Sequence, residues 1–153
     1  NTLEICGWKQ GECIELSDGL LFYEVNYVNG NRYGLYRMWY DNGQLWHNFN
    51  YINDVEHGLY RKWYKNGQVC YKYNYANGVK HGLCCDWYST GQLLNEYIFV
   101  NGIKHGLCCS WYENGRLWYE YNYVNGIKHD LCRGWHENGQ LCYESNYANG
   151  VKV

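Results

Sequence analysis

Paired cysteines are the residues of this sequence whose type and spacing could carry chemistry. "HGLCC" occurs twice, at positions 81–85 and 105–109, each time with two cysteines shortly after a histidine. Histidine and cysteine together are typical of metal sites and of thiol redox sites. Adjacent residues of a β-strand point to opposite faces, however, so Cys84 and Cys85 cannot both reach one metal ion without a bulge.

The two copies of the motif are also too far apart to share chemistry. If the copies lie on strands of one sheet, Cys84 and Cys108 are two strands and therefore roughly 10 Å apart, beyond the reach of a disulfide or a shared zinc ion. The same column holds Tyr36 and Tyr60, and a ligand position would not vary so freely. We therefore interpret the thiols as side chains that fill space, and expect no metal and no cofactor. A metal or redox role is the alternative.

The composition favours an all-β protein. Among 153 residues there are 19 tyrosines, 8 tryptophans, 18 glycines and no proline. Tyr and Trp suit half-buried pleated surfaces, glycine suits turns, and a sheet with paired N–H groups excludes proline. The net charge of -2 offers no basic field for nucleic acid and no support for binding an anionic membrane. No apolar run is long enough for a membrane-spanning helix.

Cysteine usage bears on the compartment. The chain has nine cysteines, whereas a secreted disulfide framework usually has an even number. Free cysteine behaves as a small hydrophobic residue. We therefore expect thiols in a reducing intracellular compartment (the cytoplasm) or in a virion assembled there.

A 24-residue unit is repeated along the chain without a gap. Leucine, tryptophan and glycine recur at this spacing, and we predict that they form the structural framework: the first two pack and the glycines form turns. These framework residues are Leu35, Trp39, Gly43, Leu59, Trp63, Gly67, Leu83, Trp87, Gly91, Leu107, Trp111, Gly115, Leu131, Trp135 and Gly139. A histidine column follows the same period at His57, His81, His105 and His129. We expect these histidines to lie at turn ends, where a pH-sensitive strip is the alternative to a structural role.

Each unit is predicted to contain two strands and two turns. In the first full unit the strands span residues 34–40 and 44–52, joined by Asp41-Asn42-Gly43. The second turn carries Asn-Gly, which is a strong hairpin signal because both residues accept positive φ. Successive hairpins should pair in order. The predicted fold is all-β, with tandem 24-residue β-hairpin repeats forming one elongated antiparallel meander sheet.

The strand register has two alternatives. In the preferred register one face carries Leu35, Trp39, Leu45, Phe49 and Tyr51, and the opposite face carries Tyr36, Met38, Asn48 and Asn50. Two-residue Asn-Gly loops would mix these faces instead. They would also place Cys70 opposite Cys85, where a cross-strand disulfide could form.

The two ends depart from the repeat. Residues 1–10 form an atypical segment, and the predicted array spans 11–153, with a divergent first unit at 11–29 and full units from about 30. The last unit, 149–153, is truncated. We expect that the array continues beyond residue 153 or that a partner covers its last strand edge.

The segments "NGxxHG", "WYxNGQL" and "YxYxNG" resemble the MORN (membrane occupation and recognition nexus) repeat. They resemble most closely its variant form, which occurs in antitoxin-like bacterial proteins and in large DNA viruses. The resemblance covers about residues 11–153 and implies tandem β-hairpins that bind or scaffold, without shared catalytic residues. Asp130 departs from the pattern by replacing the glycine after His129, and we expect it to distort that turn slightly.

The functional prediction is a non-catalytic scaffold for protein–protein interaction or assembly, such as a structural component of a virion. No catalytic constellation occurs, and the repeated Glu96, Glu120 and Glu144 form a column rather than an acid/base pair. A protein partner or self-association is expected. The alternatives are a small ligand, lipid or glycan bound along the aromatic face, or an antitoxin-like regulator. Exposed tyrosines are the predicted partner contacts: Tyr36, Tyr40, Tyr60, Tyr64, Tyr88 and Tyr112.

Overall fold

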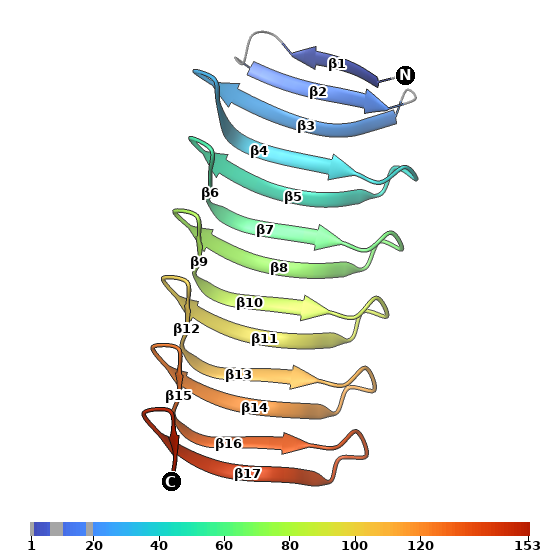
Figure 1. Cartoon of the computed structure of the whole chain (residues 1–153). Coiled ribbons are helices and arrows are strands. Elements are labelled where there is room, and N and C mark those ends of the chain that lie inside the picture. Colours follow the sequence, from blue (N-terminus) through green and yellow to red (C-terminus); the bar gives the residue numbers. More distant parts are fainter. Residues whose placement is uncertain (1, 7–10, 18–19) are drawn as a thin grey trace. The chain divides into compact units, whose positions relative to one another are not determined.

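The computed structural model describes residues 2–6, 11–17 and 20–153, and all of their regular structure is β-strand. It divides into two compact units, Asn1–Val79 and Lys80–Val153. Within each unit the strands follow one another in chain order as an antiparallel meander (Figure 1). The prediction of tandem β-hairpins in an all-β meander is confirmed. Part of the predicted N-terminal segment (1 and 7–10) lies outside the described residues.

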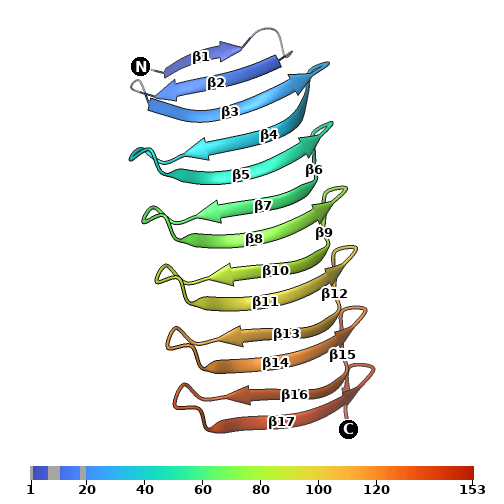
Figure 2. The same ribbon diagram turned by 180° about the vertical axis from the view of Figure 1, so that it is seen from behind.

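The strand boundaries follow the 24-residue period. Unit 1 contains β1 (Thr2–Cys6), β2 (Gly11–Ser17), β3 (Leu20–Val28), β4 (Asn31–Trp39), β5 (Leu45–Ile52), β6 (Val55–Glu56), β7 (Gly58–Trp63) and β8 (Val69–Ala76). The short β9 (Val79–Lys80) spans the unit boundary. Unit 2 contains β10 (Gly82–Trp87), β11 (Leu93–Val100), β12 (Ile103–Lys104), β13 (Gly106–Trp111), β14 (Leu117–Val124), β15 (Ile127–Lys128), β16 (Asp130–Trp135), β17 (Leu141–Ala148) and β18 (Val151–Lys152). The reverse view in Figure 2 shows the same order.

The Asn-Gly turns are tight two-residue loops. In the pairing of β14 with β15, Val124 lies opposite Ile127, so only Asn125 and Gly126 form the loop. Their φ angles are 50° and 79°, the two positive values that a type I′ turn requires. The Gly126 N–H donates to the carbonyl of Lys104 in the preceding hairpin at 2.8 Å. Gly78, Gly102 and Gly150 donate in the same way, so these Asn-Gly turns also tie one repeat to the next.

The opposite turn has a different construction. The N–H of Gly43 donates to the carbonyl of Tyr40 at 3.0 Å, and the N–H of Tyr40 donates to the carbonyl of Gln44 at 2.8 Å. Gly43 has a φ of 78°, which suits glycine. The register then shifts between Met38 and Trp39, which marks a β-bulge. The same shift recurs before each framework tryptophan at positions 63, 87, 111 and 135.

The preferred register is therefore wrong. Directly opposite residues of an antiparallel pair share one face of the sheet, and Leu35 lies opposite Asn50 while Tyr36 lies opposite Phe49. The face with Phe49 and Tyr51 carries Tyr36, and Leu35 lies on the other side. The reason is that the two-residue turn and the bulge each shift the pairing by one residue, which exchanges the faces.

Asp130 keeps the backbone conformation of the glycines that it replaces. Gly82 and Gly106 have φ angles of 74° and 72° at this position, and Asp130 has 57°. Its carboxylate accepts a hydrogen bond from Asn122 Nδ2 at 3.1 Å. The expected distortion of the turn is therefore wrong, because the aspartate adopts the left-handed conformation and anchors it locally.

We predict that Asp130→Gly stabilises the chain by up to about 1 kcal/mol, because glycine adopts positive φ without steric cost. Urea unfolding of both proteins measures the difference. Gly106→Asp, the reverse exchange at the equivalent position of the preceding repeat, is the matched control and should lower the free energy of unfolding. A less stable Asp130→Gly would show that the bond to Asn122 outweighs the strain.

Gly134 makes room for a tyrosine ring. It lies opposite Tyr143 in the pairing of β16 with β17. A Cβ atom built on Gly134 would lie 2.2 Å from Cε1 of Tyr143. We predict that Gly134→Ala lowers the free energy of unfolding by about 1–3 kcal/mol through overpacking.

A double-mutant cycle checks this cause. Tyr143→Asn introduces the residue that stands at the equivalent position 95 and removes the ring. Gly134→Ala should then cost much less in the Tyr143→Asn protein than in the wild type. Equal costs in both proteins would rule out the ring as the cause.

Candidate functional site

One face of the sheet in each unit is lined with aromatic rings, and we call it the aromatic face. In unit 1 the ring centroids of Tyr36 and Phe49 lie 4.9 Å apart, and those of Phe49 and Tyr60 lie 5.3 Å apart. In unit 2 the rings of Tyr119 and Tyr121 are stacked at 4.7 Å. The two contacts of unit 1 join neighbouring strands, whereas Tyr119 and Tyr121 are two residues apart on β14. The rings therefore pack both across the strands and along them.

A cavity of about 320 Å³ opens on the aromatic face of unit 1. Six rings and one carboxylate line it: Phe49, Tyr51, Glu56, Tyr60, Tyr71, Tyr73 and Tyr75. They come from β5, β6, β7 and β8, and the observed strand pairing places all seven side chains on the same face of the sheet. A concave, mostly aromatic site with a single charged group is suited to binding, since it provides contact area and one point of specificity.

His47 and Tyr60 form a hydrogen-bonded pair beside this cavity. Tyr60 Oη lies 2.9 Å from His47 Nδ1. Burial, together with the charge of Lys62, lowers the pKa of His47 to about 4. His47 is therefore neutral at neutral pH, and its tautomer decides which of the two atoms donates the hydrogen bond.

We predict that His47 titrates near pH 4 and makes stability pH-dependent. Its pKa is about 4 in the folded state, against about 6.5 in an unfolded chain. The unfolded state therefore binds more protons between these values, and the free energy of unfolding falls as the pH drops through this window. Two-dimensional NMR of the imidazole measures the pKa.

His47→Tyr is the matched control, since tyrosine stands at the equivalent positions 71 and 119. The variant should lose part of the pH dependence of unfolding between about pH 4 and 6.5. An imidazole pKa near 6.5 in the folded wild type would contradict the prediction.

The "HGLCC" cysteines are packed residues. Cys84, Cys108 and Cys132 are at most 1% exposed and lie on the aromatic face, opposite Tyr97, Tyr121 and Ser145. Burial, with the charges of Glu120 and Glu96, raises the pKa of Cys109 to about 11. A protonated thiol is a poor nucleophile and a poor metal ligand. The interpretation that the thiols fill space agrees with this burial.

Disulfide bonding differs from the expectation at one position. Cys13 is disulfide-bonded, and its Cα partner across β1 and β2 is Cys6. The expectation that all thiols are reduced is therefore wrong for Cys13. Cys70 and Cys85 carry thiols, so the cross-strand disulfide between them is not formed.

The predicted contact tyrosines are half-buried rather than exposed. Tyr36 and Tyr60 belong to the aromatic face. Tyr40 instead donates from its hydroxyl to the carbonyl of Trp63, 2.9 Å away in the next repeat. Tyr88 and Tyr112 repeat this bond to the carbonyls of Trp111 and Trp135, at 3.1 and 2.8 Å. This column joins repeats, and its role in partner contact stays a prediction, as does that of Tyr64.

The framework columns differ in burial. Leu35, Leu83 and Leu107 are 40%, 46% and 49% exposed, since their side of the sheet is not the aromatic face. The five framework tryptophans are half-buried. Each framework glycine has a positive φ, between 78° and 90°.

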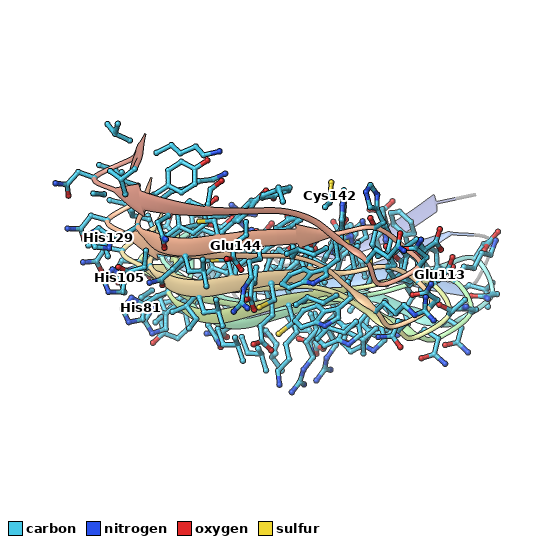
Figure 3. All side chains as sticks on the ribbon, turned by 90° about the horizontal axis from the view of Figure 1, so that it is seen from below. His81, His105, Glu113, His129, Cys142 and Glu144 are labelled. Carbon is cyan, nitrogen blue, oxygen red and sulfur yellow. The ribbon has the colours of Figure 1, made fainter. Side chains whose placement is uncertain are left out.

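The histidine column lies at turn ends, as Figure 3 shows for unit 2. His81, His105 and His129 lie at the same end of the strands, and Glu113 lies at the opposite end. The N–H of His105 donates to the carbonyl of Ile98 at 2.9 Å, and His129 repeats the bond to Asn122. The backbone of this column therefore continues the pairing between repeats.

The part of the chain that the structure describes contains neither a metal-binding group of side chains nor a membrane-spanning helix. No three His, Cys, Asp or Glu side chains among residues 2–6, 11–17 and 20–153 are grouped so that they could hold a metal ion. Within the same residues, no helix has the length and apolar character needed to cross a membrane.

The fold and the repeat define a class of protein, the tandem β-hairpin arrays. The sequence profile of the MORN repeat variant matches residues 32–53, 56–77, 80–101, 104–125 and 131–149. The chain therefore belongs to the MORN repeat variant family, whose repeats are generally involved in protein or membrane binding. The last match starts after Asp130, the residue that departs from the repeat pattern.

No curated protein matches the sequence significantly. Among solved structures, a mutant of S. aureus TarM in complex with fondaparinux, alpha-GlcNAc-glycerol and UDP shares 17% identity at a TM-score of 0.41, over 69% of this chain and 21% of the other. A second structure of TarM shares 18% identity at 0.40, over 68% and 20%. The chain thus spans about a fifth of the length of these structures, and the likeness carries no functional argument.

The sequence reasoning missed most of the cavity. Of its lining residues, only Tyr60 was a predicted contact. Tyr73 and Tyr75 alternate along β8 on the same face, which was a usable signal. Glu56 could also have been singled out from the sequence by its charge, since the equivalent positions 32, 80, 104, 128 and 152 all hold Arg or Lys.

Proposed function

We propose that this chain is a non-catalytic binding scaffold that contacts a protein partner through its aromatic face. The observation that carries the proposal is the 320 Å³ cavity lined by six rings and one carboxylate. Tyrosine and other aromatic residues concentrate binding energy at protein interfaces, because they bury a large area at little cost in side-chain entropy. General protein or membrane binding by the family agrees with this proposal.

The absence of catalysis is part of the proposal. The titratable groups with shifted pKa values serve packing: burial raises the pKa of Cys108 and Cys109 and lowers that of His47. Catalytic groups would instead need pKa values tuned toward the working pH and a common cleft. A protein partner is favoured over a lipid surface because the net charge of -2 gives no attraction to anionic membranes.

The cellular compartment and the biological role are more specific parts of the proposal. The thiols at seven described cysteines support a reducing intracellular compartment, although Cys13 is disulfide-bonded. A role within a virion, and an antitoxin-like regulatory role, rest on the resemblance alone and remain predictions.

We predict that a photo-cross-linking residue at Tyr73 captures a protein neighbour in the native source, read by mass spectrometry. The same residue at Lys72 is the matched control, since adjacent side chains of β8 point to opposite faces. A near-stoichiometric protein captured from position 73 and not from 72 would support the scaffold. Equal capture from both positions, or lipid or glycan without protein, would refute it.

A further inference from the structure

The face of the sheet opposite the aromatic face, which we call the reverse face, carries a column of charged residues. The strand pairs that form this charged column are Arg37 with Asn48, Arg61 with Lys72, Cys85 with Glu96, Cys109 with Glu120 and Arg133 with Glu144. Two of its arginines pair with a carboxylate of the preceding strand, Arg37 with Glu24 and Arg133 with Glu120, each at 2.7 Å. Ion pairs between neighbouring strands are therefore a feature of this column.

Unit 1 leaves two basic residues of the charged column without a carboxylate. Arg61 lies opposite Lys72 on one side and opposite Asn48 on the other. Both basic residues are exposed, and neither forms an ion pair within the part of the chain that the structure describes. Like charges directly opposite each other destabilise a strand pair. A carboxylate from outside the unit would relieve this repulsion.

Unit 2 carries the complementary charge at the same level of its strands. Glu96 is the repeat equivalent of Lys72 and lies opposite Cys85 and Cys109 on the two flanking strands, where no basic residue stands. Among the described residues, none forms an ion pair with Glu96. An uncompensated carboxylate and an uncompensated basic pair therefore occupy corresponding places in the two units.

Aliphatic side chains lie beside the charged column on the reverse face, toward the Asn-Gly turns. On β11 to β15 of unit 2, six of them are 37% to 50% exposed: Ile98, Val100, Ile103, Leu107, Val124 and Ile127. In unit 1, Leu35, Ile52 and Val55 are 39% to 41% exposed. Ile98 departs from the repeat, because positions 50, 74, 122 and 146 all hold asparagine. Contiguous exposed apolar side chains mark interaction sites on proteins.

We propose that two copies of the chain associate through their reverse faces, with Arg61 and Lys72 of one copy against Glu96 of the other. Packed sheets keep their strands nearly aligned. When the reverse face of unit 1 lies on that of unit 2 from the other copy, with their Asn-Gly ends together, aliphatic side chains meet aliphatic side chains and the basic pair meets the carboxylate. A second copy is the favoured occupant, because it supplies both charges at the matching level. The inference goes beyond the proposed function, which uses the aromatic face.

Sedimentation equilibrium of the whole chain measures this association. Cys142→Ser is used as the background, because the exposed Cys142 thiol could join copies through a disulfide. We expect reversible association in the micromolar range that weakens as salt is added. A chain that stays monomeric up to about 1 mM would overturn the proposal.

Charge reversal tests the pairing. Arg61→Glu with Lys72→Glu in one protein, and Glu96→Lys in another, should each weaken association about tenfold or more. An equimolar mixture of the two proteins should restore it, because each then supplies the charge that the other needs. Glu137→Lys, at an exposed turn residue outside the reverse face, is the control and should leave association unchanged. A mixture that associates no more tightly than either protein alone would refute the pairing.

Ile98→Asn tests the apolar part of the contact. It introduces the residue that the other repeats hold at this position, so the fold should persist, which urea unfolding checks. Association should weaken about threefold or more, because an apolar side chain leaves the contact. A folded Ile98→Asn protein with unchanged association would overturn the reverse face as the contact.

The cross-linking experiment tells a second copy from the partner of the aromatic face. A cross-linking residue at position 72 lies in the proposed contact and should capture a second copy of the chain. The partner of the aromatic face should be captured from position 73 only. Capture from position 72 of a protein other than a second copy would overturn the second copy as the occupant, and it would leave the result at position 73 to decide the proposed function.

Discussion

The two-residue turn with left-handed backbone at both positions is the constraint on which the rest of the structure depends. Asn125 and Gly126 illustrate it, with positive φ at both residues. The loop of two residues fixes which residues lie opposite one another and therefore share a face of the sheet, and the bulge before each framework tryptophan shifts that register by one residue. The aromatic face exists because of that pairing. A single-residue change of register would scatter the same rings over both sides.

Repetition then turns a local geometry into a surface. The glycines of four Asn-Gly turns, Gly78, Gly102, Gly126 and Gly150, hydrogen-bond to the preceding hairpin, and the Tyr40 column bonds to the backbone of the next one. Small residues fit under large ones on the aromatic face: Gly134 lies beneath the Tyr143 ring, and buried cysteines lie opposite tyrosines. Stability in such an array is distributed over neighbouring hairpins, which alone would be marginal. One repeat can therefore depart from the pattern, as the unit with Glu56 does, while its neighbours hold the fold.

The cysteine thiols and the His47 imidazole, whose types suggested chemistry, take part in packing and hydrogen bonding within the fold. Burial keeps the Cys109 thiol protonated at neutral pH and His47 neutral. The function proposed for the chain is recognition, by aromatic rings that lie side by side on one face of the sheet. The family's general role in binding and the cavity on unit 1 point the same way, from independent observations.

The sequence by itself determined the repeat, the all-β class, the turn positions and the family, because these depend on local residue preferences and on a period that is visible in the letters. It also indicated that the paired cysteines were packing residues, by the geometry of a strand. It could not decide which residues share a face of the sheet with Tyr36. That depends on a β-bulge between Met38 and Trp39, and no residue type marks this bulge in the sequence. The cavity could not be predicted from the sequence for a similar reason. Phe49, Glu56, Tyr60 and Tyr75 are separated along the chain, and only strand pairing in three dimensions brought them around one space.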